Sequence, residues 1–276
     1  MKKIFKRFVR YFISFILCLV IFLIAFLSII NITLFNDGFV IKHIDKTQFS
    51  EKAYNEIIDS FVSLGSASGV PKEVFEKAIN ISFVSTDIYN IISDSYKNNE
   101  LSFAKNDLIL NLKSEISNFC NENNIEITDS IKNDIDLLLE HLVSEYESVV
   151  ILPLFSQIIQ IKSIFDGYYF AFLIGSIFYL AFSVFILLFL EKWPHRRIRY
   201  ISYSFIASGL MLLIIPIITA VWDGIKRIQI TPKFMYDFVV SFFNGIINQF
   251  YIFGAILFLI GVILMVISGK LRQKAK

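Results

Sequence analysis

Residues 187–204, LLFLEKWPHRRIRYISYS, place four basic residues and a histidine between two apolar runs that carry no charge. The preceding run covers residues 167–190 and the following run covers residues 200–222. Each run exceeds the roughly 20 residues that a helix needs to cross about 30 Å of hydrocarbon. Because Pro194 favours a turn, the stretch predicts two membrane-spanning helices joined by a short charged loop at 191–199.

Two further charge-free windows lie at residues 11–36 and 238–269, and within the second we assign 250–269 to the membrane. The 276-residue chain is 55% hydrophobic and 16% aromatic, with a mean hydropathy of +0.63. Such a composition is too apolar for an ordinary soluble domain. We therefore predict an all-α integral membrane protein with a four-transmembrane-helix bundle.

The first apolar run follows a basic tail, residues 1–10, and so has the order of a secretory signal. A cleavable signal has an apolar region of about 7 to 15 residues and a small-residue cleavage site. The run at 11–36 is longer, and it ends in NITLFNDG without such a site. We expect a retained signal anchor.

Lysine and arginine are distributed unevenly between the two sides of the predicted bundle. The tails at 1–10 and 270–276 and the loop at 191–199 hold 13 basic residues and one acid. Residues 37–166 hold 10 lysines, no arginine and 21 acids, a net charge of −11. By the positive-inside rule, we expect a cell-membrane protein with both termini cytoplasmic, and with 37–166 and the loop and helix at 223–249 extracytoplasmic.

We interpret the arginines of the 191–199 loop as stop-transfer charges that also contact anionic lipid headgroups, at about 1 kcal/mol each. A dedicated partner-binding or phosphate-binding loop is the alternative. The overall charge of +2 averages two compartments, so we expect no nucleic-acid partner.

The segment 37–166 has helical periodicity, and no convincing strand pair interrupts it. In residues 49–64 four apolar side chains recur at intervals of four, on one face: Phe49, Ala53, Ile57 and Phe61. Residues 130–150 have a comparable apolar seam: Ile131, Ile135, Leu138, Leu142 and Val149. We predict an extracytoplasmic domain of four or five helices, inserted between the first and second spans.

Turn and cap residues divide this domain. The sequence GSASG at 65–69 ends one helix, Pro71 opens the next, and Ser85, Thr86 or Asp87 is expected to cap a third. The runs after Pro153 and Pro232 are helical in pattern and lead into the second and fourth spans, which predicts a stem beyond the bilayer. Amphipathic helices lying flat on the membrane are the alternative.

Candidate chemistry is sparse. The three histidines, His43, His141 and His195, lie in separate regions, and no HExxH, CxxC, GxSxG or glycine-rich phosphate loop occurs. The metal-ligating sets that we considered are His141 and Glu145 with Glu140 or Glu147, and Asp134 and Asp136 with Glu140. We interpret both as solvated helix faces and expect no catalytic residue, no cofactor and no metal site.

Inside the predicted spans there is no Asp, Glu, Lys, Arg or His, which argues against coupled ion transport. The third span is crowded with small residues and a proline: Ser202, Ser204, Ser208, Gly209 and Pro216. We interpret these as positions of close helix packing, with a serine-lined pore as the alternative. Cys18 in the first span and Cys120 in the outer domain are not expected to form a disulfide with each other.

The order of elements, together with DIYNIISDSYKNN at 87–99 and NDIDLLLEHLVSEY at 133–146, resembles uncharacterised four-span membrane proteins of low-GC Gram-positive bacteria, the Firmicutes. The resemblance implies the same topology and no known activity.

Function is predicted from topology. We expect a non-enzymatic membrane protein whose outer domain binds a protein partner or senses an envelope condition, or that forms a homo-oligomer. The alternatives are an oligomeric channel or an accessory subunit of a transporter. A membrane enzyme is a further class, for which the nearby polar residues are Asp166, Tyr168, Asp223 and Asp237.

Overall fold

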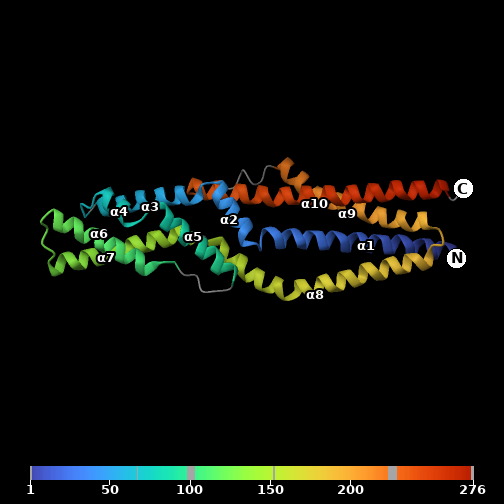
Figure 1. Ribbon diagram of the computed structural model, residues 1–276, viewed down its shortest axis with the longest axis horizontal. Coiled ribbons are helices and arrows are strands. Elements are labelled where there is room, and N and C mark those ends of the chain that lie inside the picture. Colours follow the sequence, from blue (N-terminus) through green and yellow to red (C-terminus); the bar gives the residue numbers. More distant parts are fainter. Residues whose placement is uncertain (1, 67, 98–102, 152, 223–228, 275–276) are drawn as a thin grey trace. The chain divides into compact units, whose positions relative to one another are not determined.

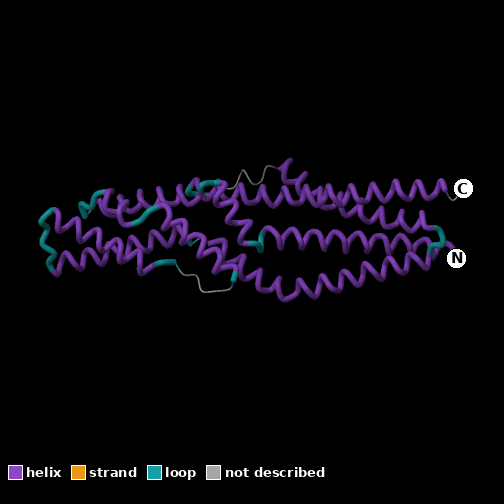
Figure 2. The backbone as a smooth tube through the Cα atoms, viewed as in Figure 1, coloured by secondary structure: helices purple, strands orange, loops and turns teal. Residues whose placement is uncertain are grey.

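A computed structural model of the protein describes residues 2–66, 68–97, 103–151, 153–222 and 229–274, and it gives side chains from residue 8 onward except at 153–159. Ala67 of the predicted GSASG break and Asp223 therefore lie outside the described residues. All regular structure in the described residues is α-helical, in ten helices (Figure 1), without a strand (Figure 2). The predicted all-α class is confirmed.

The chain forms two compact units. One unit contains Met1–Asn36, Lys162–Gln229 and Val240–Lys276, and the other contains Asp37–Ile161 and Ile230–Val239. We call the first the span unit and the second the helical domain. Two long helices, α8 and α10, contribute residues to both units.

Four helices of the chain are long and apolar enough to cross a membrane. They are α1 (Lys2–Thr33), α8 (Pro153–Leu190), α9 (Pro194–Trp222) and α10 (Lys233–Lys274). The stretches that qualify as candidate spans by length and composition are Phe8–Thr33, Gln160–Leu190, Pro194–Trp222 and Lys233–Lys274. These four helices support a multi-pass membrane protein. Helices α8 and α10 each run without a break into a span, as the sequence pattern indicates.

Within the span unit, small residues bring helices α9 and α10 close together. A Cβ atom on Gly209 would lie 2.6 Å from the backbone nitrogen of Phe258, and one on Gly261 would lie 2.7 Å from that of Ile206. The hydroxyl of Ser202 also donates to the carbonyl of Gly261 at 2.8 Å. The small residues of the third span therefore serve helix packing.

Between the first and second spans lie six helices of the described chain. They are α2 (Asp37–Lys46), α3 (Phe49–Ser66), α4 (Lys72–Ala78), α5 (Ile81–Tyr96), α6 (Lys105–Glu122) and α7 (Asp129–Val150). The sequence predicts four or five helices and misses α2. That helix has ten residues and buries only Val40, His43 and Ile44, so it lacks the long apolar repeat on which the prediction depends.

Most of the apolar side chains predicted to face the core of the helical domain are buried. Phe49, Ala53, Ile57 and Phe61 are all 0% exposed. On α7, the predicted seam residues Leu138, Leu142 and Val149 are buried, while Ile131 and Ile135 are partly exposed. Each large apolar side chain so buried contributes about 1.5 to 3 kcal/mol, which makes this core the main source of the domain's stability.

The prediction for the start of α5 is wrong. The helix begins at Ile81, and its cap is Asn80, whose side-chain oxygen accepts from the backbone N–H of Phe83 at 2.8 Å. Asp87 lies a turn and a half later and is buried, because its position matches the apolar face that holds Val84 and Ile91. Helix α4 begins directly after Pro71, as expected.

The first turns of α10 are part of the helical domain. The ring of Phe49 on α3 packs edge-on against Phe234 and Phe238, with centroid distances of 5.0 and 5.5 Å. The ammonium of Lys52 donates to Asp237 Oδ2 at 2.8 Å. The N-terminal end of α3 thus fixes the start of a helix that continues to Lys274.

Candidate functional site

An apolar groove of about 540 Å³ lies in the helical domain, at the C-terminal end of α3. Its volume is within the range of ligand-binding clefts. It is lined by side chains of α3, α6 and α7 and of the connections after α3 and α6: Leu64, Ser68, Val70, Ile116, Phe119, Cys120, Ile125, Ile131, Asp134, Ile135, Leu137, Leu138 and His141. Nine of these 13 residues are aliphatic or aromatic, so the groove is mainly apolar.

Tight turns at the ends of two helices shape this groove. A Cβ on Gly65 would lie 2.6 Å from the ring of Phe75, so the last turn of α3 packs closely against α4. Gly69 has a φ of +70°, which a residue with a side chain rarely adopts, and the chain there turns to present Val70. After α6, Asn124 also has positive φ, at 55°.

Several apolar side chains at the groove are left in contact with solvent. Leu137 is 56% exposed, and Leu64, Ile125 and the nearby Ile127 are each about 40% exposed. Single exposed apolar residues are normal on a protein surface, but a contiguous group around a concave wall marks a binding site more often. The groove is therefore the strongest candidate site among the described residues.

The electrostatic surroundings of the groove are negative. Between residues 114 and 161 the chain has nine acidic residues and one lysine, Lys132. Asp134 lines the groove itself. Glu122, Glu126 and Asp129, in and beside the connection between α6 and α7, are all exposed. A positively charged ligand would be attracted to this end of the domain.

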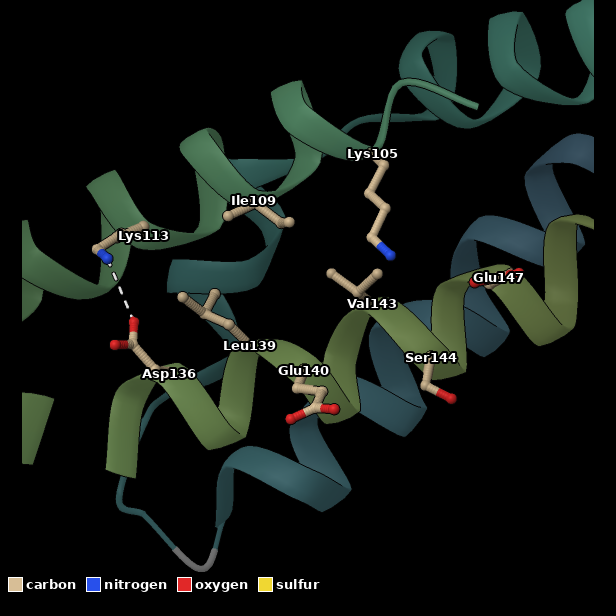
Figure 3. A pocket seen from close by; sticks show the side chains of 9 residues that line it. All are labelled: Lys105, Ile109, Lys113, Asp136, Leu139, Glu140, Val143, Ser144 and Glu147. Carbon is tan, nitrogen blue, oxygen red and sulfur yellow. Dashed lines mark hydrogen bonds and ion pairs between the residues drawn. The ribbon is translucent and has the colours of Figure 1, made fainter. Parts of the chain in front are cut away.

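A second cavity, of about 410 Å³, lies between α6 and α7 on another face of α7 (Figure 3). In this cleft Lys113 of α6 faces Asp136 of α7, and Lys105 extends from α6 toward Val143. Lys113 Nζ lies 3.2 Å from Asp136 Oδ1. Exposed ion pairs of this kind contribute at most about 1 kcal/mol to stability. We interpret the cleft as a polar contact between α6 and α7 rather than as a binding site.

The candidate metal ligands of α7 do not come together. His141 lines the groove, whereas Glu140 and Glu147 line the cleft on the other face of the helix. Asp134 and Asp136 are divided in the same way. Within the described parts of the chain, no group of three or more His, Cys, Asp or Glu side chains could hold a metal ion.

The polar residues considered for a membrane enzyme do not form a site among the described residues. Asp166 accepts from Lys162 at 2.5 Å within the span unit, and Asp237 accepts from Lys52 within the helical domain. Tyr168 is exposed. Asp223 lies outside the described residues. The two described carboxylates therefore form ion pairs.

A buried polar pair, which the sequence prediction misses, lies in the core of the helical domain. The Tyr146 hydroxyl donates to Asp87 Oδ2 at 2.8 Å, and the backbone N–H of Ala104 donates to Asp87 Oδ1 at 3.2 Å. Burial raises the pKa of Asp87 above its usual value, although both hydrogen bonds act to lower it. Burial and the bond to Asp87 raise the pKa of Tyr146. The pair joins α5 to α7.

Part of the basic loop has a structural role in the span unit. The guanidinium of Arg197 donates to the carbonyls of Glu191, at 2.6 Å, and Leu188, at 3.0 Å, and so satisfies the C-terminal end of α8. Glu191, the one acid of the loop, is buried and forms an ion pair with Arg10 of α1. These bonds fix where the loop begins.

Both cysteines are free thiols, as expected. Comparisons with protein-family models, curated proteins and solved structures found no match to this chain. Any functional assignment therefore depends on the geometry of the groove and on the distribution of charge along the sequence.

Proposed function

We propose that this protein is a non-enzymatic, multi-pass protein of the cell membrane whose helical domain lies outside the cytoplasm and binds a partner protein in the groove. The observation that carries the proposal is the apolar groove, with Leu137 more than half exposed in its wall. The first span serves as a retained signal anchor, and the other spans hold the domain at the membrane surface.

The orientation is supported by charge. Thirteen of the 26 basic residues lie in the two tails and the 191–199 loop, with a single acid among them. The segment at 37–166 has a net charge of −11. Short positively charged segments stay in the cytoplasm during insertion, so this distribution favours cytoplasmic termini and an external domain.

Helix α3 connects the groove with the start of α10. Leu64, at the C-terminal end of α3, lines the groove, while Phe49 and Lys52, near its N-terminal end, contact the start of α10. An occupant that shifts α3 would therefore act on the helix that contains the fourth span. The start of α10 is therefore the element through which a sensor in this domain would act on the fourth span.

Cysteine labelling in intact cells tests the orientation. Native Cys120 is only 6% exposed, so both native cysteines are replaced by alanine and Asn121→Cys provides an exposed thiol next to position 120. We expect a membrane-impermeant maleimide to label Asn121→Cys in intact cells and Lys192→Cys only after lysis. The reverse pattern would place the domain in the cytoplasm and refute this part of the proposal.

Site-specific photo-crosslinking tests the partner site. A photoreactive amino acid replaces Leu137 in the full-length protein in its own cells, and the control replaces Leu110, which is 64% exposed on α6 and lines neither cavity. We expect a discrete cross-linked protein from position 137 and none from position 110. Equal products from both positions, or none from 137, would argue against a partner in the groove.

An oligomeric channel or transporter subunit is the competing proposal. Two serines that could line a pore have other hydrogen-bond partners: Ser204 donates to the carbonyl of Ser14 on α1 at 2.7 Å, and Ser208 donates to the carbonyl of Phe205 on its own helix at 3.0 Å. Conductance of the purified protein in planar bilayers, abolished by Ser204→Val, would favour this alternative.

A further inference from the structure

We propose that the groove binds a cationic amphipathic α-helix supplied by another protein. This deepens the proposed function, because it names the chemistry of the partner that occupies the same groove. An apolar face of the bound helix would lie on Leu64, Ile125 and Leu137, and its lysines or arginines would face the acidic residues beside the groove.

The acidic residues near the groove favour a positively charged partner. Asp134 lies in the lining, and the surrounding stretch from 114 to 161 has nine acids against Lys132 alone. Of these nine acids, Asp136, Glu140 and Glu147 line the cleft on the other face of α7, and Asp136 pairs there with Lys113, which leaves six. Opposite charge on the partner would speed its association and reject acidic competitors, while the apolar wall supplies the affinity.

The helical walls and the length of the groove favour a bound segment that is itself an α-helix. The described part of the domain has no strand that could extend a sheet, and the walls of the groove are the helices α3, α6 and α7. Along α7 the lining runs from Ile131 to His141, a separation of ten positions or about 15 Å at a rise of 1.5 Å per residue. That length matches about three turns of a bound helix, which presents apolar anchors at positions i, i+4 and i+7.

The same charge disfavours two other occupants. A second copy of this chain would bring another strongly acidic domain against the first, and the surface of an anionic membrane would be repelled likewise. The basic tails of a second copy lie, in the proposed orientation, on the other side of the membrane. A cationic segment of a different protein avoids both conflicts.

The test uses the full-length protein in nanodiscs of zwitterionic phosphatidylcholine and an 18-residue peptide of leucine and lysine with leucines on one helical face. The peptide carries a photoreactive phenylalanine among its leucines, and empty nanodiscs correct for binding to lipid. We expect cross-links to map to residues 116–125 and 131–141. A peptide with the same leucines but glutamate in place of lysine should bind at least roughly tenfold more weakly.

Two variants test the groove, and a third serves as a control. Leu137→Glu should weaken binding of the lysine peptide by roughly tenfold or more, as for an anchor residue of an interface, whereas Leu110→Glu, equally exposed on α6, should leave it unchanged. Asp134→Lys should weaken binding by about tenfold at low salt, with the difference falling below about twofold at 1 M NaCl, where charges are screened.

The peptide experiments and the cellular cross-linking can fail independently, so their results distinguish the cationic-helix proposal from the proposed function. Equal binding of the lysine and glutamate peptides, equal effects of Leu137→Glu and Leu110→Glu, or cross-links confined to the spans would overturn the cationic-helix proposal. A cellular cross-link at position 137 in those cases would leave the proposed function standing. Binding of the lysine peptide without any cellular cross-link at position 137 would show that the groove accepts a cationic helix, but would contradict the proposal that it binds a partner protein in the cell.

Discussion

Removing the hydroxyl of Tyr146 should destabilise the helical domain through Asp87. In Tyr146→Phe the buried carboxylate loses the bond from the hydroxyl, at 2.8 Å, and keeps the longer bond from Ala104, at 3.2 Å. A hydrogen bond to a charged group is worth about 1.5 to 3 kcal/mol, and the ring itself is conserved, so no cavity adds to this loss. The ring stays packed between Phe83 and Phe103.

Hydrogen exchange measures this change where it occurs. In the full-length protein in nanodiscs, a loss of 1.5 to 3 kcal/mol corresponds to roughly 10-fold to 150-fold faster exchange of the protected amides of α5 and α7. The expected penalty is larger at pH 7.5 than at pH 4.5. At the lower pH a larger fraction of Asp87 is protonated, because its pKa is raised, and the bond to a carboxylate then matters less.

A matched control is available in the same domain. The hydroxyl of Tyr89 donates to Asp45 Oδ1 at 2.5 Å, but at the surface, where water can replace it. Tyr89→Phe should therefore cost less than about 1 kcal/mol. If Tyr146→Phe changed the exchange of α5 and α7 by no more than Tyr89→Phe does, the buried pair would not hold these helices together, and this reasoning would be refuted.

Three further outcomes are expected. Above about pH 4, the stability of α5 and α7 in the wild type should fall as pH rises until the raised pKa of Asp87 is passed, since the folded state binds the Asp87 proton more tightly than the unfolded state does. Asp87→Asn should flatten that slope in pH-corrected hydrogen exchange. Gly209→Val should lower the unfolding midpoint in detergent by several degrees, while Gly175→Ala, which meets no atom within 4 Å, should not. Arg10→Ala leaves buried Glu191 without its ion pair and should cost about 3 kcal/mol in chemical unfolding, against less than about 0.5 kcal/mol for exposed Lys192→Ala.

Sequence reasoning identified the features that depend on composition and period. Charge-free runs of more than 20 residues have few alternatives to membrane helices, and the repeat of four from Phe49 to Phe61 has one apolar face to bury. Helix α2 was not predicted because it has only ten residues and a histidine on its buried side, so its sequence shows no clear apolar repeat.

The details that sequence reasoning missed depend on partners distant in the chain. The sequence offers Asp87 as one of three candidate caps because aspartate favours helix starts, whereas its partner in the structure, Tyr146, lies 59 residues away. Its spacing from Val84 and Ile91 was the available signal of a buried position. The groove requires Leu64 of α3 and Leu137 of α7 to lie at one cavity, which no local pattern predicts.

The position of Cys120 in the wall of the groove has a practical consequence. A thiol that is 6% exposed reacts mainly when the local structure opens, so its reaction rate with a small neutral reagent depends on what covers it. An occupant of the groove should slow that reaction. The native chain therefore contains its own occupancy reporter, which needs no engineered label and can be read by mass spectrometry while candidate partners are screened.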